Sequence, residues 1–380
     1  MRQTGKYLTV TMLGETVRAF VPARLPPAKP VLDLAAFADA LSASALAIAR
    51  LNAVAGLVQS THWLTYSAVR KEALLTSQIE GTQATLMDVF DVEADFTVAN
   101  ADDVEEVTNY LRAFEYSVAQ LRRPRGLPLS MRLLCEAHRH LMTGVRGGNK
   151  QPGEIRRSQN WIGGTRPGNA AFVPPPENKL ADLLSDLERF IHANGKLPPL
   201  VKVALAHAQF ETIHPFLDGN GRIGRLLIAL MLEDYKLVDA PVLHVSGFLK
   251  RHQAEYYRRL SNIRTEGDWE GWVAFFLECV VAAAAESELT IIDVQTMINA
   301  DRARLLATAN ISQATYRLFE LLPGMPRFTI EAARKALDTT FPTANAAVAN
   351  LVRVGIVKEL TGRSKNRGFS YEGYVQRLAR

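Results

Sequence analysis

A stretch rich in Gly, Pro and Asn, residues 146–176, interrupts a chain in which apolar residues mostly recur at helical spacing. Within it, two short apolar pieces, 161–162 and 171–173, flank a Gly/Pro turn, which indicates a β-hairpin. Long apolar segments without internal Pro indicate amphipathic helices, and Ser130 is a predicted N-cap. The sequence therefore predicts an all-α body with one hairpin. We expect helices over 32–58, 63–79, 102–122, 130–144, 177–194, 198–213, 222–236, 250–263 and 269–298.

The two ends of the chain depart from this helical pattern. Residues 1–30 alternate weakly and end in a Pro-rich run, which predicts an extended arm with one short hairpin. From about residue 311, three short helices precede two strands, which is a winged-helix outline. We place a domain boundary near 300–310. The expected C-terminal elements are helices 311–322, 329–337 and 342–354 and strands 356–360 and 368–371.

The composition is that of an ordinary globular protein. The 380 residues are 48% hydrophobic and 22% charged, which excludes a disordered or collagen-like chain and predicts two or three domains. A net charge of +5 is too small to imply nucleic-acid binding by itself. Residues 310–380 hold 11 Lys and Arg against 5 Asp and Glu, a net of +6, so any basic patch belongs to the C-terminal end.

The sequence indicates neither secretion nor a membrane. The N-terminus has no apolar signal-peptide core, and the longest apolar stretch, 272–285, is shorter than the roughly 18–20 residues that span a bilayer. Cys135 and Cys279 have neither CxxC neighbours nor zinc-type spacing. We therefore expect a soluble, cytoplasmic protein with buried thiols and no membrane partner.

The segment 214–225, HPFLDGNGRIGR, lies between two expected helices. Gly219 and Gly221 allow backbone angles that other residues resist, so the turn can point several N–H groups at one spot. The dipole of the following helix adds partial positive charge there. Arg222 and Arg225 are three residues apart and share a helix face. Two guanidiniums beside such an anion-binding nest suit a polyphosphate.

Two further side chains complete the segment. Asp218 supplies a hard oxygen ligand, which suits Mg²⁺ on phosphates. His214 stands just before the loop, where an imidazole could take a proton from an incoming hydroxyl. Each feature alone is common as a helix cap, a turn or a solvated pair. Their occurrence within twelve consecutive residues indicates a functional site.

This segment resembles the signature of Fic-domain proteins, His-x-Phe-x-(Asp/Glu)-Gly-Asn-Gly-Arg-x-x-Arg. The resemblance implies a Fic helical core and an enzyme that transfers AMP from ATP to a protein hydroxyl. By position, His214 would be the general base, Asp218 would hold the metal between the α- and β-phosphates, and the 219–221 backbone would cradle the phosphates. The matching fixed positions are His214, Phe216, Asp218, Gly219, Asn220, Gly221, Arg222 and Arg225.

The resemblance also implies further nucleotide contacts. Asn220 would orient the phosphates, while Arg222 and Arg225 would bind the β- and γ-phosphates. Contacts to adenine would come from residues 248–257, with Arg251 as the first choice and Tyr256 as the second; an ordinary amphipathic helix is the alternative there. The expected nucleotide-binding set is Glu80, His214, Gly219, Asn220, Gly221, Arg222, Ile223, Gly224, Arg225 and Arg251.

The upstream string 76–81, TSQIEG, resembles the inhibitory motif (Ser/Thr)-x-x-x-Glu-(Gly/Asn) of this family. Thr76 and Glu80 are four residues apart on one face of an expected helix, and Gly81 is a common helix stop. The resemblance implies an N-terminal inhibitory helix whose Glu80 pairs with an arginine of the phosphate site. Our expectation is Arg225, whose guanidinium would then be unavailable to the γ-phosphate.

The hairpin expected over 161–173 matches the position of the family's flap, which aligns a target segment by strand addition. A purely structural hairpin is the alternative. The residues expected to form this target-docking flap are Trp161, Ile162, Phe172 and Val173.

The expected winged helix also occurs in relatives of this family. Its third helix carries small polar residues that could approach DNA bases, and residues 362–367 could contact phosphates as a wing. That helix is nearly neutral and Ala-rich, however, so contact with a protein remains equally open, and a spacer role is the third alternative. The small polar residues are Thr343, Asn345 and Asn350.

Together these features predict an autoinhibited protein adenylyltransferase that uses ATP and Mg²⁺ and modifies Ser, Thr or Tyr hydroxyls of target proteins, self-modification included. The alternatives are an enzyme that also removes AMP with the help of Glu80, and a DNA-binding regulator. The sequence leaves a homodimer open and names neither the target nor the trigger that relieves inhibition. The expected domains are 1–95 (arm and inhibitory-helix region), 96–300 (Fic catalytic domain) and 308–380 (winged helix).

Overall fold

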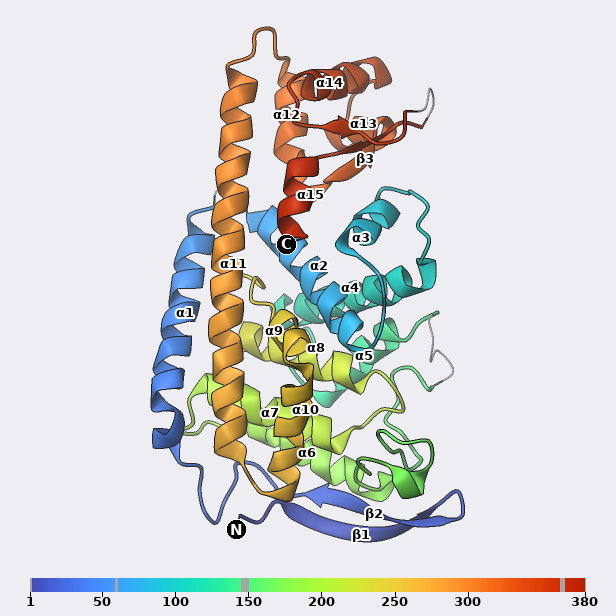
Figure 1. Ribbon diagram of the computed structural model, residues 1–380, viewed down its shortest axis with the longest axis vertical. Helices are drawn as coiled ribbons and strands as arrows, with labels where there is room; N and C mark the ends of the chain where they lie inside the picture. The colour runs from blue at the N-terminus through green and yellow to red at the C-terminus, as the bar shows by residue number, and fades with distance from the viewer. Residues whose placement is uncertain (1, 59–60, 145–149, 363–365, 380) are drawn as a thin grey trace.

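The computed structural model describes residues 2–58, 61–144, 150–362 and 366–379. These residues form a mostly helical molecule with a small antiparallel sheet at each end (Figure 1). The long helix α11, Trp269–Leu306, runs beside both the helical body and the C-terminal elements. The predominantly helical fold predicted from the sequence is thus confirmed.

The helices of the body agree in position with most of the expected ranges. The exceptions are α3, which was not predicted, and the helix expected over 250–263, which is divided into α9 and α10 at His252. The elements are α1 (Ala38–Gly56), α2 (Thr61–Ile79), α3 (Leu86–Glu93), α4 (Ala101–Arg122), α5 (Met131–Leu141), α6 (Leu180–His192), α7 (Pro199–Ile213), α8 (Asn220–Asp234), α9 (Ser246–Arg251) and α10 (Gln253–Thr265).

The two central helices, α7 and α8, are buried along almost their whole length. Their sequences are apolar on nearly every face, which is typical of helices enclosed by other elements. Helix α7 packs against α6, α8 and α11, and α8 also packs against α4 and α5. The short loop between α7 and α8 is therefore held at a fixed place in the core.

The N-caps of α5 and α3 explain why α5 was predicted from the sequence and α3 was not. Ser130 caps α5 as predicted, with its hydroxyl accepting a hydrogen bond from the Leu133 N–H at 3.3 Å. Helix α3 begins with a capping box in which the Thr85 hydroxyl and the Asp88 carboxylate each accept the other's backbone N–H. Asp in place of the usual Glu or Gln, and a helix of only eight residues, made this start inconspicuous.

The N-terminal arm forms the predicted hairpin, β1 (Gly5–Met12) paired with β2 (Glu15–Pro22). The hairpin lies across one end of the body (Figure 1). The Phe20 N–H donates to the Val173 carbonyl at 2.9 Å, so β2 is attached to the expected flap. The arm is therefore part of the folded body.

The described C-terminal residues form four α-helices and a three-stranded antiparallel sheet of order β3-β5-β4. Strand β3 and the last helix were not predicted, because both are short. Of the expected wing, residues 363–365 lie outside the described residues. The elements are α12 (Gln313–Leu321), β3 (Arg327–Thr329), α13 (Ile330–Leu337), α14 (Phe341–Arg353), β4 (Lys358–Glu359), β5 (Gly368–Ser370) and α15 (Glu372–Leu378).

These C-terminal elements pack directly on the body. Tyr374 of α15 meets Trp63 of α2 edge to face, with ring centroids 6.1 Å apart. The Arg327 guanidinium forms an ion pair with Asp91 of α3. The C-terminal elements therefore contact the helix that ends just before Glu80 and the helix that follows it.

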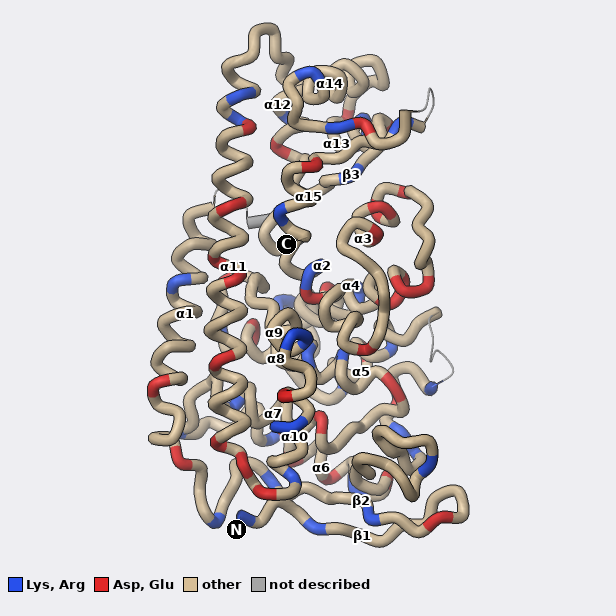
Figure 2. Tube along the Cα trace, viewed as in Figure 1, with Lys and Arg blue, Asp and Glu red and all other residues tan. Residues whose placement is uncertain are grey.

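Charged residues of both signs are interspersed along the chain (Figure 2). Cys279 is buried and Cys135 partly buried, and both are free thiols. Among the described residues, one helical stretch, Leu34–Gly56, has the length and apolar composition that a membrane span requires. The longest apolar stretch noted in the sequence, 272–285, belongs to α11 instead.

Candidate active site

The loop between α7 and α8 is shaped by two left-handed residues. Helix α7 ends at Ile213, and His214 follows with φ +51° as its C-cap. Gly219, with φ +73°, is the N-cap of α8, which begins at Asn220, two residues earlier than expected. Gly is favoured there because it adopts positive φ without steric cost. His214 and the N-terminus of α8 both line the cavity described below.

Asn220 holds this loop closed through its side-chain amide. Its Oδ1 accepts the Phe216 N–H and its Nδ2 donates to the Phe216 carbonyl, both at 2.8 Å. Asn220 also lines the cavity described below. The side-chain amide of Asn220 is thus used by the backbone of Phe216. Asn220 can therefore orient phosphates only indirectly, by holding the shape of the loop.

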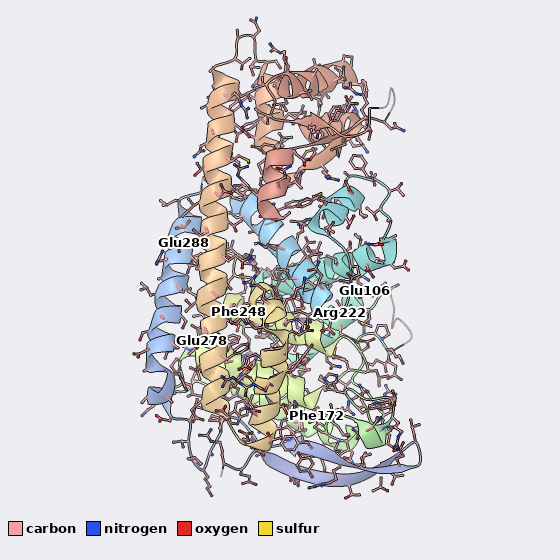
Figure 3. All side chains as sticks on the ribbon, viewed as in Figure 1. Glu106, Phe172, Arg222, Phe248, Glu278 and Glu288 are labelled. Atoms are coloured by element: carbon pink, nitrogen blue, oxygen red, sulfur yellow. The ribbon has the colours of Figure 1, made fainter. Side chains whose placement is uncertain are left out.

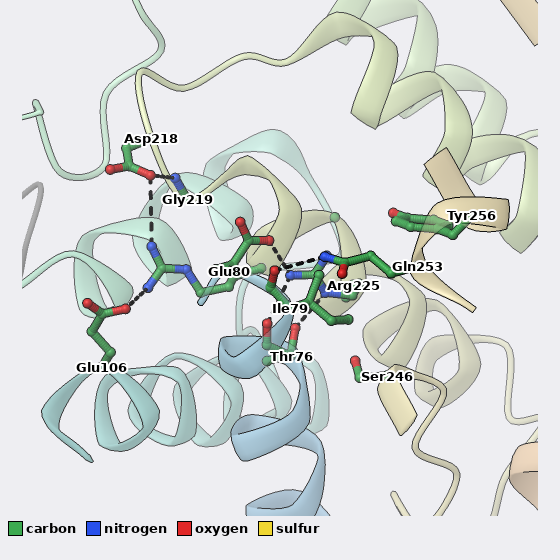
Figure 4. Close-up of polar contacts among 12 residues, drawn as sticks. Thr76, Ile79, Glu80, Glu106, Asp218, Gly219, Arg225, Ser246, Gln253 and Tyr256 are labelled. Carbon is green, nitrogen blue, oxygen red and sulfur yellow. Dashed lines mark hydrogen bonds and ion pairs between the residues drawn. The ribbon is translucent and has the colours of Figure 1, made fainter. Parts of the chain in front are cut away.

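Arg225 of α8 is joined to the end of α2 by three hydrogen bonds (Figure 4). Nη2 donates to Glu80 Oε1 at 2.5 Å and to the Thr76 carbonyl at 3.1 Å, and Nε donates to Thr76 Oγ1 at 2.6 Å. Arg225 is 1% exposed, whereas the Glu80 side chain is 36% exposed. Burial raises the pKa of Glu80, but Arg225 outweighs it, so this pKa lies below its ordinary value.

The Glu80 carboxylate also lies over the first turn of α8. A Cβ on Gly221 would overlap Glu80 Oε1, which is how closely the carboxylate approaches the backbone. A helix N-terminus favours an anion at that place through its free N–H groups and its dipole. Gly81, with φ +103°, turns the chain away directly afterwards. Thr76, Glu80, Gly221 and Arg225, which lie far apart in the sequence, are thus brought together.

Arg222 does not share the environment of Arg225. Its Nη1 donates to the Glu106 carboxylate of α4 at 3.1 Å, both side chains being buried, and its Nη2 is 3.9 Å from Asp218 (Figures 3 and 4). Three residues span 300° of a helix, so the two arginines diverge by about 60°. Arg222 is outside the lining of the cavity, contrary to the expectation of a common phosphate-binding face.

The cavity above this loop has a volume of about 630 Å³. Glu80, Gly221 and Arg225 form one part of its lining, and residues of α10 and of the flap form another. Ile223 and Gly224, both expected to bind the nucleotide, are buried and do not line the cavity. The other described lining residues are Asn160, Trp161, Ile162, Gly163, Ala171, Phe172, Glu211, His214, Leu217, Asp218, Gly219, Asn220, Tyr256, Tyr257, Leu260, Ser261 and Arg264.

The flap is less regular than expected. Ile162 and Phe172 exchange two backbone hydrogen bonds, of 2.8 and 3.1 Å, and form an isolated bridge. Trp161, Ile162 and Phe172 line the cavity. Val173 faces away and packs against Val17 and other residues of β2, because alternate residues of an extended segment point to opposite sides.

His214 is a wall residue of the cavity, and its Nδ1 is buried without a hydrogen-bond partner among the described residues. Burial, and next the positive charge of Arg156, lower the pKa of His214 to about 4. Its imidazole is therefore neutral at pH 7 and able to accept a proton. Glu211, one turn earlier on α7, also lines the cavity, and burial raises its pKa to about 7.

Asp218 is positioned as a ligand for one cation. Its side chain is 46% exposed at the cavity edge, and its Oδ1 accepts the Gly219 N–H at 2.6 Å. No group of three or more His, Cys, Asp or Glu side chains suited to a metal occurs in the described part of the chain. A single carboxylate fits Mg²⁺, which takes one or two carboxylates and completes its shell with phosphates and water.

The expected adenine contacts are placed differently. Arg251 ends α9, where it forms an ion pair with Glu286 of α11, and it is outside the cavity lining. Tyr256 lines the cavity, with its hydroxyl bonded to His207 Nε2 at 2.9 Å. Tyr257, the last residue of the expected range 248–257, also lines the cavity, whereas Arg264 of α10 lies beyond that range and was missed.

Two stretches of the chain match known protein families. Residues 38–119 match the Fic/DOC family N-terminal domain, and residues 128–232 match the Fic/DOC family. Protein adenylyltransferase Fic of Drosophila grimshawi is 31% identical over 211 residues, covering 53% of this chain and 39% of that protein. Its counterpart in Drosophila erecta is 32% identical over 185 residues, covering 47% and 33%. The chain thus spans between a third and two fifths of these curated relatives.

The fold has a solved counterpart over most of its length. A Fic family protein from Desulfovibrio desulfuricans superimposes with a TM-score of 0.56 and 21% sequence identity, covering 90% of this chain and 97% of that chain. At this identity the likeness establishes the fold alone. The loop His214–Arg225, which carries the signature, lies inside the matched residues 128–232. Two stretches of the chain thus match the N-terminal and the Fic models of the Fic/DOC family, and the fold agrees with that match.

Proposed function

We propose that the chain is a protein adenylyltransferase, which transfers AMP from ATP to a Ser, Thr or Tyr hydroxyl of a target protein. The observation that carries the proposal is one cavity lined both by the neutral imidazole of His214 and by the first residues of α8. The matched relatives are named protein adenylyltransferase Fic. The chain itself is then an enzyme of the nucleotidyltransferase class.

In this mechanism the residues of the loop act mainly by positioning and charge stabilisation. The phosphates of ATP lie over the first turn of α8, where the backbone N–H groups of 219–221 and Arg225 meet them. His214 accepts the proton of the target hydroxyl as that oxygen attacks the α-phosphorus, and pyrophosphate leaves. Asp218 would hold Mg²⁺, which supplies charge neutralisation to the phosphates when bound.

The nucleoside half of ATP would occupy the other end of the cavity. The flap residues Ile162 and Phe172 face α10 there, where Tyr257 and Leu260 offer ring and aliphatic surface. Arg264 lies with its guanidinium 4.0 Å from the centre of the Phe172 ring. These residues replace Arg251 as the candidates for contact with adenosine.

The same contacts support autoinhibition by α2. Glu80 occupies the anion position over Gly221 and takes the guanidinium of Arg225, so a γ-phosphate and the carboxylate compete for one place. ATP would then bind in a pose that does not react. Glu80 could also position a water for the reverse chemistry, so AMP removal by the same site is the second candidate reaction.

We further propose that residues 308–380 form a winged-helix module, with α12–α14 and the sheet β3-β5-β4 as its helices and wing. Asp91 of α3 and Asp95, just after that helix, line a cavity beside Phe341, at the start of α14. Asp91 is paired with Arg327, but the Asp95 carboxylate at that end of the helix repels nucleic-acid phosphates, so we favour a protein partner over DNA. DNA binding that is strong at low salt and falls steeply with salt would overturn this choice.

The remaining proposals follow the sequence expectations. Residues 1–95 would be the arm with the inhibitory helix, and 96–300 the catalytic domain. Two free thiols agree with a cytoplasmic location. A homodimer remains a proposal to be tested by sedimentation.

The function is tested with ATP labelled on the α- or the γ-phosphate. The unaltered chain, Glu80→Gly and His214→Ala are each incubated with Mg²⁺ and label, with and without candidate target proteins. Transfer of the α-label by Glu80→Gly, lost on adding His214→Ala, is the expected result. Transfer of the γ-label alone would mean a kinase reaction, and absence of both labels would favour AMP removal or a regulator without turnover.

A further inference from the structure

Arg156 is buried in the loop that leads into the flap, and only 2% of its surface is exposed. Its Nε donates to the His214 carbonyl at 2.9 Å, Nη1 to the Ser158 carbonyl at 3.0 Å and Nη2 to the Pro175 carbonyl at 2.5 Å. Its backbone N–H also donates to the Pro215 carbonyl at 2.9 Å. One side chain thus joins the start of the flap, the end of the flap and the catalytic loop.

Arg156 forms no ion pair with any described carboxylate. A buried charge without a counter-ion is costly, so a structural tie between loops would ordinarily be made by neutral groups. The cost is visible as a pKa of Arg156 that burial lowers to about 10. Glu177 is the acidic group that partly opposes this effect. We therefore expect the positive charge of Arg156 itself, and not only its hydrogen bonds, to have a function.

The carbonyls that Arg156 holds belong to the groups whose relative position the reaction depends on. Ser158 and Pro175 lie on either side of the flap, whose bridge residues Ile162 and Phe172 line the cavity. His214 is in the strained left-handed conformation, with φ +51°, and a non-glycine residue there needs support from its surroundings. Bonding of the His214 carbonyl supplies such support.

We propose that Arg156 is a positioning residue that sets the flap at a fixed place relative to His214 and, through its positive charge, keeps that imidazole in the neutral form that acts as a base. The proposal deepens the adenylyltransferase function and rests on it. Other charged groups act on the same imidazole, and Arg156 is the largest among them. Glu80, next to the end of α2, raises the pKa of His214, and Arg264 of α10 lowers it; a hydrogen bond with the backbone of Glu211 also raises it.

Substitutions separate the two roles of Arg156. Arg156→Gln removes the charge and most of the bonds, whereas Arg156→Lys keeps the charge and cannot reach three carbonyls. Both are made in the Glu80→Gly chain, and Arg157→Gln is the control, since Arg157 is exposed and, among the described residues, bonds Glu154 alone. We expect both Arg156 variants to lose about 10²-fold in kcat, the effect of a misplaced reacting group. Only Arg156→Gln should shift the acid limb of kcat/KM to higher pH.

The protonation of His214 is measured independently of activity by NMR titration of its imidazole. In the unaltered chain the midpoint should lie near pH 4, below the ordinary 6.5, and it should rise in Arg156→Gln but not in Arg156→Lys. A midpoint of 6.5 in the unaltered chain would overturn the proposal without requiring any variant to fold. Unchanged kcat and unchanged acid limb in both variants would also overturn it.

The two proposals fail in different ways. If the His214 midpoint moves as expected while Glu80→Gly transfers no label, the adenylyltransferase function fails and the electrostatic role of Arg156 stands. If Glu80→Gly is active and Arg156→Gln resembles Arg157→Gln in rate and pH profile, the role of Arg156 fails. A fall in kcat equal in both variants, with no shift of the acid limb in either, would reduce Arg156 to a structural tie.

Discussion

The Glu80 carboxylate accepts a hydrogen bond of 2.5 Å from the Arg225 guanidinium, although 145 residues separate the two in the chain. The carboxylate also covers Gly221, the second residue of α8. One acidic side chain at the end of α2 therefore occupies both the cation and the helix N-terminus of the phosphate site. Thr76, which bonds Arg225 through its hydroxyl and its carbonyl, fixes the guanidinium in this arrangement.

Removal of the Glu80 carboxylate should release the site. We expect Glu80→Gly to raise α-label transfer roughly 5- to 150-fold, the range of ordinary coupling free energies, because Arg225 becomes available to ATP. Glu80→Gln keeps the shape of the side chain and loses its charge, so its rate of transfer should lie between those of the unaltered chain and Glu80→Gly. The measurement is the initial rate of labelling at saturating ATP. Equal rates for all three chains would remove the inhibition model and leave the fold unaffected.

The pH dependence of transfer should report an acidic pKa for the base. Burial lowers the pKa of His214 to about 4, so the imidazole is already neutral well below pH 6.5. In the Glu80→Gly chain we expect kcat/KM to be flat from pH 8 to near 5 and to fall as pH drops through about 4. An acid limb centred at 6.5 would show that the imidazole is solvated like a free histidine.

The pair of Arg222 and Glu106 should matter more to stability than to nucleotide binding. Both side chains are buried, and the only other carboxylate that the described residues place near Arg222 is Asp218 at 3.9 Å, so removal of Glu106 leaves the buried guanidinium without its close partner, at a cost of about 3–5 kcal/mol. We expect Glu106→Ala to lower the free energy of unfolding by that amount in urea titrations. The exposed neighbour Glu105 is the matched control, and Glu105→Ala should stay within about 0.5 kcal/mol. A loss of ATP affinity without a loss of stability would restore the phosphate-binding role of Arg222.

His207 should make the chain less stable in acid. It is fully buried, it bonds the Gly224 carbonyl and the Tyr256 hydroxyl, and burial lowers its pKa to about 3. Between pH 6.5 and 3 the unfolded chain takes up a proton here that the folded chain refuses, so stability falls as pH falls. This group contributes about 1.4 kcal/mol per pH unit in that window.

The substitution His207→Gln isolates that contribution. The free energy of unfolding is measured in urea at pH 7.5, 6.5, 5.5 and 4.5 for both chains, and the difference between them should shrink as pH falls. Glu72 and Glu211, whose pKa values burial raises, act in the opposite sense but cancel in this comparison. A difference that is constant with pH would mean that His207 takes up its proton in the folded chain as well.

The sequence predicted most of the long helices because their signals are local. Periodicity locates α4 and α7, and the signature string from His214 to Arg225 is one continuous segment, formed by the loop 214–219 and the first turns of α8. The direction of a side chain is set by its tertiary surroundings. Arg222 and Arg225 share a helix, but their side chains point in different directions. Arg222 forms an ion pair with Glu106, and Arg225 forms one with Glu80. Spacing along the sequence could not separate them.

The roles of residues that act through tertiary contacts could not be predicted from the sequence either. Arg156 lies in the Gly-, Pro- and Asn-rich stretch and belongs to no motif that we recognised, yet it bonds the carbonyl of His214. Arg251 was favoured for adenine because of its place after the signature helix. The break at His252 directs it to Glu286 instead, and Arg264, four turns further on, reaches the cavity.

The contact between Tyr374 and Trp63 predicts that the C-terminal elements unfold together with α2. Tyr374 is 0% exposed and Trp63 5% exposed, and their rings meet edge to face across the junction with the body. Tyr374→Ala leaves a cavity there and should cost about 3–5 kcal/mol. Gln376→Ala, on the exposed side of the same helix, is the control and should stay within about 0.5 kcal/mol.

Because the lost contact belongs to both parts, calorimetry should show the transition of α2 and that of residues 308–380 moving to lower temperature together. Two transitions of which only one moves would establish residues 308–380 as an independently stable domain and would make the junction with α2 a weak interface.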